Sequence, residues 1–401
     1  MRAYSAASEE TVRTRNLLKD WAGEGFLTQA QYHQMEQETG CELRRTNIFL
    51  RLVLFLFTLI IVGAAAALIF VILQPTNQQT IGILLLIFSG ICYAAAEQAV
   101  SQARLYRYGI EESLAVCSVA FLCAGLQVSL FSGPSYSTAP PEAEFLVPAA
   151  GAIASLWLWQ RFGFHYAFLA AMIFVLWLPG YWTSSQMARH LIVATLYATG
   201  LFVVVTARPR YRLTYRNDEY SIAEALLWLG IYLAINLPFS PVNLLVHWWG
   251  APPNSIAFSR PFYLVTWVVT WCLPPVVLAR GLRGKDRAVI VVGIAIAILT
   301  LVSNKSYLGW NRNSWDPMLL GALLIGVAVF TRRWLANGPS GIRCGFTAQR
   351  LSGKDKSWMN IGATAFGLGS QNASILSPQG NGSDVHFGGG DSGGGGASTK
   401  F

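Results

Sequence analysis

Long runs of apolar residues alternate with short polar segments along most of this chain. The first run, from Leu52 to Leu73, holds 22 residues without one charged side chain. A helix rises 1.5 Å per residue, so about 20 apolar residues are needed to cross the hydrocarbon core of a bilayer. The run is therefore predicted to be a transmembrane helix, and the pattern after it predicts more of them.

Ten apolar segments can be delimited, at 50–73, 81–97, 113–131, 145–160, 164–180, 190–206, 221–238, 262–279, 288–303 and 317–334. They predict an all-α fold class: a polytopic transmembrane helical bundle of about ten spans. Three domains are expected: a cytosolic α-hairpin at 1–47, the ten-span domain at 48–334 and a cytosolic tail at 335–401. The tail is Gly-rich at its end and is predicted to be largely disordered.

The polar N-terminal region contains the signals of two short helices. Ser8, followed by acidic residues, marks one helix start, and residues 23–25 contain two glycines that end this helix. Thr28 caps the second helix, with Gln31 three residues later as the other half of a capping box. Such a hairpin is too small for a large core of its own. We expect it to lean on the membrane domain or to bind a protein partner.

The composition supports a membrane protein. The chain is 53% apolar and 12% charged, whereas soluble domains carry about 25% charged residues. Its 14 tryptophans suit the interfaces of a bilayer, where aromatic residues gather.

The basic residues predict the orientation. With the N-terminus in the cytosol, 25 of the 29 Lys and Arg residues fall in the terminal regions or in inner loops. The outer loops hold only four, which are Arg189, Arg260, Lys305 and Arg312. This is the positive-inside pattern, with both termini cytosolic. It accounts for the net charge of +9 without a nucleic-acid partner, and it favours a bilayer with anionic headgroups at the inner basic loops.

The sequence gives no sign of a cofactor, a metal or a catalytic residue. Its six cysteines form no CxxC pair, and its five histidines are scattered. No disulfide is expected, because no cysteine falls in a segment assigned to the outside. Walker and HExxH motifs are missing from the sequence.

Two acids are candidates for a polar site near the inner leaflet. Glu97 ends the second predicted span, and Glu224 lies about one turn into the seventh. Charge in a membrane helix is costly and usually faces the bundle interior or a cavity. The simpler alternative is that each acid pairs at headgroup depth with an arginine, such as Arg104 or Arg216.

A proline pair completes the candidate site. Pro274 and Pro275 fall in the inner half of the eighth predicted span. Proline removes a backbone donor, so a kink or a break is expected there. The freed carbonyls either line a cavity and coordinate an ion or substrate or are satisfied by neighbouring helices. Because Glu97, Glu224 and the prolines have similar predicted depth, one hypothesis is a shared cytosol-facing vestibule.

The N-terminal residues Leu18, Trp21, 24–28 (Glu-Gly-Phe-Leu-Thr) and Gln31 resemble the helical hairpin of a bacterial membrane-protein family. That family carries domain of unknown function 2157, and its members have many spans after the hairpin. The resemblance implies a bacterial cytoplasmic (inner) membrane protein. It implies no activity, ligand or catalytic residue.

Three classes of function remain open. The favoured one is a membrane scaffold or binding protein that uses its N-terminal hairpin for a partner. The alternatives are a transporter for a small solute or lipid and a membrane enzyme acting on lipid-linked substrates. An enzyme should show clustered titratable groups, and a transporter should show polar residues at the midplane or internal repeats. Neither signal is apparent, so both alternatives are less expected than a scaffold, and an enzyme is the least expected class.

Overall fold

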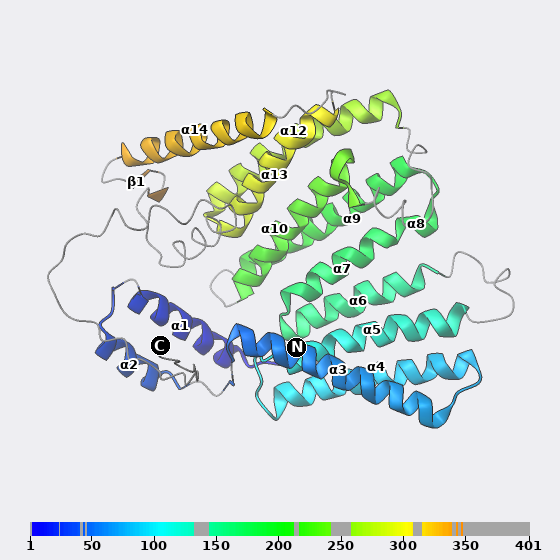
Figure 1. Cartoon of the computed structure of the whole chain (residues 1–401). Coiled ribbons are helices and arrows are strands. Elements are labelled where there is room, and N and C mark those ends of the chain that lie inside the picture. The colour runs from blue at the N-terminus through cyan, green and yellow to red at the C-terminus, as the bar shows by residue number, and fades with distance from the viewer. Residues whose placement is uncertain are drawn as a thin grey trace, which may run out of the picture.

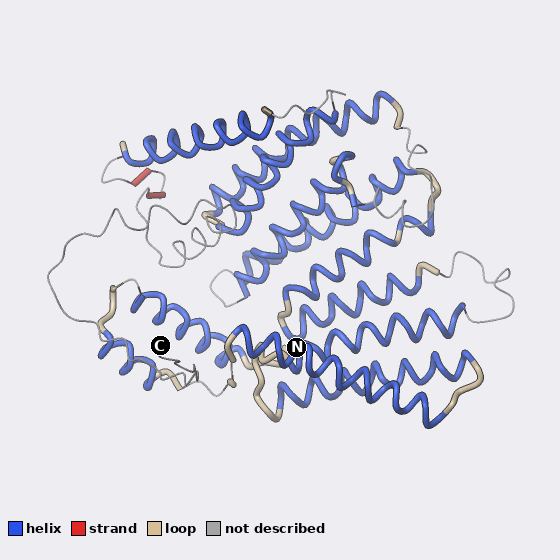
Figure 2. The backbone as a smooth tube through the Cα atoms, in the orientation of Figure 1, coloured by secondary structure: helices blue, strands red, loops and turns tan. Residues whose placement is uncertain are grey.

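The structure is a computed structural model that describes residues 2–23, 25–40, 43–44, 46–131, 144–211, 216–241, 258–307, 315–338, 342–343 and 346–347. Most of these residues lie in helices, and long helices run side by side through the molecule (Figures 1 and 2). The only strands in the described part are β1 (Ile342–Arg343) and β2 (Phe346–Thr347), which form a short antiparallel pair. The predicted all-α class is confirmed.

A helix covers each of the ten predicted apolar segments. They are α3 (Ile48–Leu73), α4 (Gln78–Ser101), α5 (Ile110–Phe131), α6 (Leu146–Phe162), α7 (His165–Trp177) with α8 (Pro179–Trp182), α9 (Gln186–Ala207), α10 (Arg216–Ile235), α12 (Arg260–Gly284), α13 (Arg287–Tyr307) and α14 (Asp316–Ala336). Two 3₁₀ turns, η2 (Arg208–Tyr211) and η3 (Leu237–Phe239), follow α9 and α10.

Eight helical segments in the described residues are long and apolar enough to cross a membrane: α3, α4, α5, α7 continued by α8, α9 continued by η2, α12, α13 and α14. The prediction of ten spans also counted α6 and α10, which are not among these eight segments. Helix α6 has only 17 residues. Helix α10 begins with charged residues and contains Glu224 farther along.

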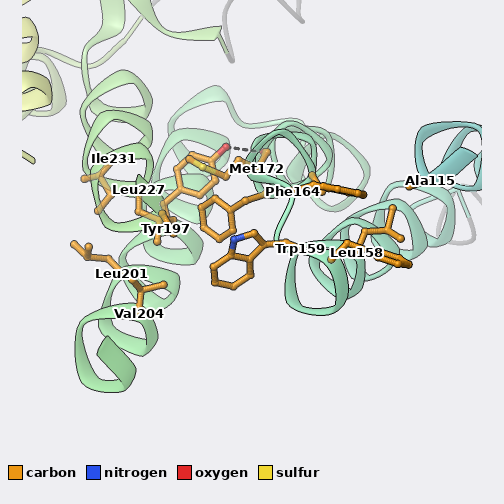
Figure 3. Packing of buried hydrophobic residues seen from close by; sticks show 14 of the residues in the cluster. Ala115, Leu158, Trp159, Phe164, Met172, Tyr197, Leu201, Val204, Leu227 and Ile231 are labelled. Atoms are coloured by element: carbon orange, nitrogen blue, oxygen red, sulfur yellow. Dashed lines mark hydrogen bonds between the residues drawn. The ribbon is translucent and has the colours of Figure 1, made fainter. Parts of the chain in front are cut away.

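The largest hydrophobic core lies between α6, α7, α9 and α10. Trp159, Phe164, Tyr197 and Leu227 are among its buried side chains (Figure 3). The Tyr197 hydroxyl donates to the Met172 carbonyl across this core at 2.7 Å. Helix α10 has buried residues along most of its length, so it is a central element of the bundle.

Helices α4 and α5 approach closely because small residues face each other. A Cβ added to Gly82 of α4 would lie 2.9 Å from the Ser129 backbone nitrogen and 3.1 Å from the Gly125 carbonyl oxygen of α5. Small residues at a helix interface allow two backbones to approach, which is a common packing device inside membranes.

Two further helices, α1 (Ala6–Gly23) and α2 (Gln29–Glu38), precede the long ones. The predicted capping box of Thr28 and Gln31 is confirmed at the start of α2. Helix α1 begins before the predicted Ser8, because the Ser5 hydroxyl accepts a hydrogen bond from the Ser8 backbone N–H at 3.1 Å. Arg15 of α1 donates to backbone carbonyls at the end of α2, at 2.8 and 3.0 Å. The two helices therefore pack as one segment, called the α1–α2 segment below.

Residues 348–401, which make up most of the tail predicted to be disordered, lie outside the described residues.

Candidate functional site

Ion pairs join the helix ends on one side of the bundle, which we call the basic end. The pairs are Arg51–Glu112, Arg161–Glu97, Arg208–Glu224, Arg280–Glu224 and Arg2–Glu219. They connect α3 with α5, α6 with α4, η2 and α12 with α10, and the N-terminus with α10. Because the chain returns to this end after every second long helix, the pairs hold together elements that are distant in the sequence. Figure 1 shows α1 and α2 at this end.

Glu97 lies at the edge of the basic end and is held by one arginine. Its Oε1 accepts from Arg161 Nε at 2.6 Å and its Oε2 from Arg161 Nη2 at 3.0 Å. The Tyr93 hydroxyl also donates to Oε1, at 3.0 Å. A bidentate arginine–carboxylate pair is among the stronger polar contacts. The partner is thus Arg161 of α6, rather than the predicted Arg104.

Glu224 is fully buried between two guanidinium groups. Its Oε2 lies 2.7 Å from Arg208 Nη1, and its Oε1 lies 3.0 Å from Arg280 Nε. The same Arg208 nitrogen lies 2.5 Å from Asp286. A cavity of about 350 Å³ opens beside this group. The partners are therefore Arg208 and Arg280, rather than the predicted Arg216.

The proline pair does not break α12. The helix continues through Pro274, which is buried, and Pro275, which is exposed. Proline cannot donate to the carbonyl four residues earlier, which for Pro274 is that of Thr270. The Thr300 hydroxyl of α13 approaches this carbonyl at 3.4 Å. This hydroxyl has a single proton, and the Ile296 carbonyl at 2.9 Å and the Tyr232 hydroxyl at 3.0 Å are its closer acceptors, so the freed carbonyl shares the donor with them.

Thr300 belongs to a buried polar network that the sequence analysis missed. Its hydroxyl donates to the Tyr232 hydroxyl at 3.0 Å, and the Asn236 amide donates to the same oxygen at 2.7 Å. The Asn236 amide also donates to the Ser303 hydroxyl at 3.0 Å. Isolated polar residues in apolar runs gave no signal of this network, because its members come from different helices.

The structure does not bring the four predicted site residues into one group. Glu97 pairs α4 with α6, whereas Glu224 of α10 pairs with η2 and α12. Different arginines hold the two acids: Arg161 for Glu97, and Arg208 with Arg280 for Glu224. Pro274 precedes Arg280, a partner of Glu224, by six residues, or about 9 Å along the helix.

The first residues of the chain form a second buried group that the sequence analysis missed. Arg2 donates to Glu9 Oε1 at 2.5 Å and to Glu219 Oε2, and its side chain is 5% exposed. The Ala3 N–H donates to the Arg161 carbonyl at 2.9 Å. Tyr4 packs edge-on against Tyr106. No local pattern indicated this docking, since it depends on the tertiary fold.

Burial and neighbouring charges shift the pKa values of Arg2 and Tyr4. Burial opposes the charge of Arg2, but the hydrogen bond and charge of Glu219, together with Glu9, raise its pKa above the ordinary value. Burial, followed by the nearby Glu111, raises the pKa of Tyr4 above the ordinary value. Arg2 therefore remains a cation and Tyr4 a neutral phenol at physiological pH.

The α1–α2 segment exposes apolar side chains although it is docked. Leu17, Trp21 and Phe26 are 43%, 47% and 68% exposed. Leu17 and Trp21 lie four residues apart and so share one face of α1. Phe26 lies in the turn that follows, where its N–H donates to the Trp21 carbonyl at 2.9 Å.

Within the described residues, no group of three or more His, Cys, Asp or Glu side chains is arranged to hold a metal ion. Cys92, Cys117, Cys123 and Cys272 are free thiols. Cys41 and Cys344 lie outside the described residues.

Comparison with known proteins gives no relative for this chain: no protein-family model, no curated protein and no solved structure matches it.

Proposed function

We propose that this chain is a ten-span protein of a bacterial cytoplasmic membrane, with its basic end in the cytosol. Helix α10 packs against α7, α9, α12 and α13, and α6 packs against α5 and α7. A helix surrounded by spanning helices crosses with them, which supports counting α6 and α10 as spans. The charges at the start of α10 agree with this, because they lie at the basic end, where Glu219 pairs with Arg2.

We further propose that the protein is a membrane scaffold whose α1–α2 segment, a cytosolic hairpin, binds a partner protein. The observation that carries this proposal is the exposed apolar set Leu17, Trp21 and Phe26 on a segment that is fixed to the bundle by Arg2. Aromatic side chains are enriched at the energetic centres of protein interfaces. A docked segment also loses little freedom on binding, which lowers the entropic cost of association.

The test is site-specific photo-crosslinking in cells that express the full chain. A photoreactive phenylalanine analogue replaces Trp21 or Phe26 in two variants, and the exposed polar Gln34 of α2 in the control. The proposal predicts a protein adduct of one discrete mass at both apolar positions and a much weaker one at Gln34. Adducts to lipid alone, or no adduct at either apolar position, would show that this face lies against the membrane or water instead.

The resemblance to the family with domain of unknown function 2157 is compatible with this proposal and stays a prediction. Transport of a small solute or lipid, and chemistry on lipid-linked substrates, stay the alternative predictions.

A further inference from the structure

A groove of about 630 Å³ lies between α10 and α13 at the basic end. Its walls comprise residues within 217–226 of α10 and within 287–292 of α13, the turn that joins α12 to α13, and Arg208 of η2. This volume is in the range of sites that bind small molecules. The cavity beside Glu224 adjoins it, since Arg208 and Asp286 line both.

The polarity of the groove changes along its length. On α10 the lining passes from Asn217 and Ser221 to Leu226, and on α13 from Arg287 to Val292. Both helices begin at the basic end, so both walls become apolar in the same direction. At 1.5 Å per residue, the α10 wall from residue 217 to residue 226 covers about 13 Å. A ligand that fits both walls has a polar head and a hydrocarbon chain.

The charge at the polar end of the groove favours an anion. The lining includes three basic residues, Arg208, Lys285 and Arg287, and two acids, Asp218 and Asp286. Arg208 and Asp286 offset each other, because they pair at 2.5 Å, and Asp286 also accepts from the Ser221 hydroxyl at 2.6 Å and the Ala288 N–H at 3.1 Å. The preference for an anion therefore depends on Lys285 and Arg287 against Asp218.

Lys285 and Arg287 are exposed on either side of Asp286, at the turn between α12 and α13. Lys285 adopts a left-handed backbone conformation, with φ of 50°, as the cap of α12. This turn presents both cations at the mouth of the groove, where an anionic headgroup would arrive from the bilayer.

We propose that this groove binds one anionic phospholipid. Lys285 and Arg287 hold the phosphate, and Leu226, Val291 and Val292 contact the upper part of an acyl chain. The polarity gradient favours a lipid over a soluble phosphate, because a free anion would use only the polar half. This site is independent of the partner proposed for the α1–α2 segment.

The test is native mass spectrometry of the full-length protein in mild detergent, titrated with three probes. Phosphatidylglycerol is the anionic lipid, phosphatidylethanolamine with the same chains is zwitterionic, and glycerol 3-phosphate is the soluble headgroup. The double variant Lys285→Gln/Arg287→Gln removes the charges at the mouth. Val291→Trp narrows the apolar half at a position that is 56% exposed. Arg332→Gln/Arg333→Gln on α14 is the charge-matched control.

The proposal predicts one tightly held phosphatidylglycerol per chain, with phosphatidylethanolamine binding more weakly. Each charge removed from the mouth should weaken phosphatidylglycerol binding by about fivefold. Val291→Trp should weaken it as well, and the α14 control should not.

Three results would overturn the proposal. Equal binding of both lipids by the wild-type protein would show that the groove does not select an anionic headgroup. This result is independent of whether any variant folds. Glycerol 3-phosphate binding as tightly as the lipid, and unaffected by Val291→Trp, would indicate a soluble phosphate ligand. An equal loss in the α14 control would indicate diffuse charge attraction without a defined groove.

Discussion

The guanidinium of Arg2 is buried against the carboxylate of Glu219, 217 residues later in the chain. The first residues are therefore part of the basic end of the bundle, at the centre of which α10 begins. This contact fixes the position of α1, and with it the apolar face that we propose as a binding surface. Its loss should affect the α1–α2 segment before it affects the long helices.

Replacing Arg2 by Ala is predicted to free the α1–α2 segment. The change leaves Glu9 and Glu219 buried without their cation, and breaking a buried ion pair in this way costs about 3–5 kcal/mol. Limited proteolysis should cut within residues 6–40 at least tenfold faster, while the long helices stay intact. Arg13→Ala is the control, because Arg13 is one-third exposed and lies 3.7 Å from Glu10, and such pairs contribute little. Unchanged proteolysis in the Arg2 variant would contradict the anchoring role.

Burial should make Glu224 more sensitive to substitution than Glu97. Glu224→Gln leaves Arg280 without its carboxylate and Arg208 with Asp286 alone, and it is expected to cost about 3 kcal/mol. Glu97→Gln affects a pair that is one-quarter exposed on both sides, so its cost is expected to be about 1 kcal/mol. Thermal unfolding of both variants in the same detergent measures the order. A larger loss for Glu97 would indicate that its pair carries more of the fold than its exposure suggests.

The hydroxyl of Thr300 should compensate in part for Pro274. Thr300→Val removes the hydroxyl whose single proton is shared among the Tyr232 hydroxyl, the Ile296 carbonyl and the Thr270 carbonyl, and it is expected to cost about 1–2 kcal/mol. Pro274→Ala gives α12 a backbone N–H for the same carbonyl. In a double-mutant cycle, the valine substitution should therefore cost less in the Pro274→Ala background. Strict additivity would mean that Thr300 does not stabilise the freed carbonyl.

Two glycines of α4 offer a matched test of helix packing. Gly82→Ala places a methyl group against the backbone of α5 and should destabilise the bundle by about 1–3 kcal/mol. Gly90 has no atom of another element within 4 Å of an added Cβ, so Gly90→Ala should be neutral or slightly stabilising. Thermal unfolding of the two variants distinguishes them. Equal effects would contradict the close α4–α5 approach.

The sequence predicted the elements that depend on local chemistry. The apolar runs located every long helix, because length and hydropathy alone determine where a membrane helix can form. Thr28 with Gln31 located the start of α2 through its capping box. Each of these depends on residues only a few positions apart.

The contacts of the candidate residues could not be predicted in the same way. Glu97 and Arg161 are 64 positions apart, and nothing local distinguishes Arg161 from Arg104 as the partner. The predicted depth of Glu224, near basic loops, indicated that its partner is an arginine. Which arginines pair with it, Arg208 and Arg280, depends on how α9 and α12 pack on α10. The docking of Arg2 had no sequence signal, because it requires the assembled bundle.

The orientation of the basic end underlies both the proposed partner site and the lipid headgroup site. It can be measured by labelling single cysteines with a membrane-impermeant maleimide, in a variant whose six native cysteines are replaced by alanine. The positions tested are Thr76, Gln102, Ser184, Ser259 and Lys285, each between two long helices.

The account predicts labelling of intact cells at positions 76, 184 and 259, and labelling at 102 and 285 only after the membrane is opened. Position 184 tests whether α6 crosses the membrane, and position 259 tests whether α10 does. Labelling of intact cells at 102 or 285, or protection at 184 or 259, would contradict a ten-span protein with its basic end in the cytosol.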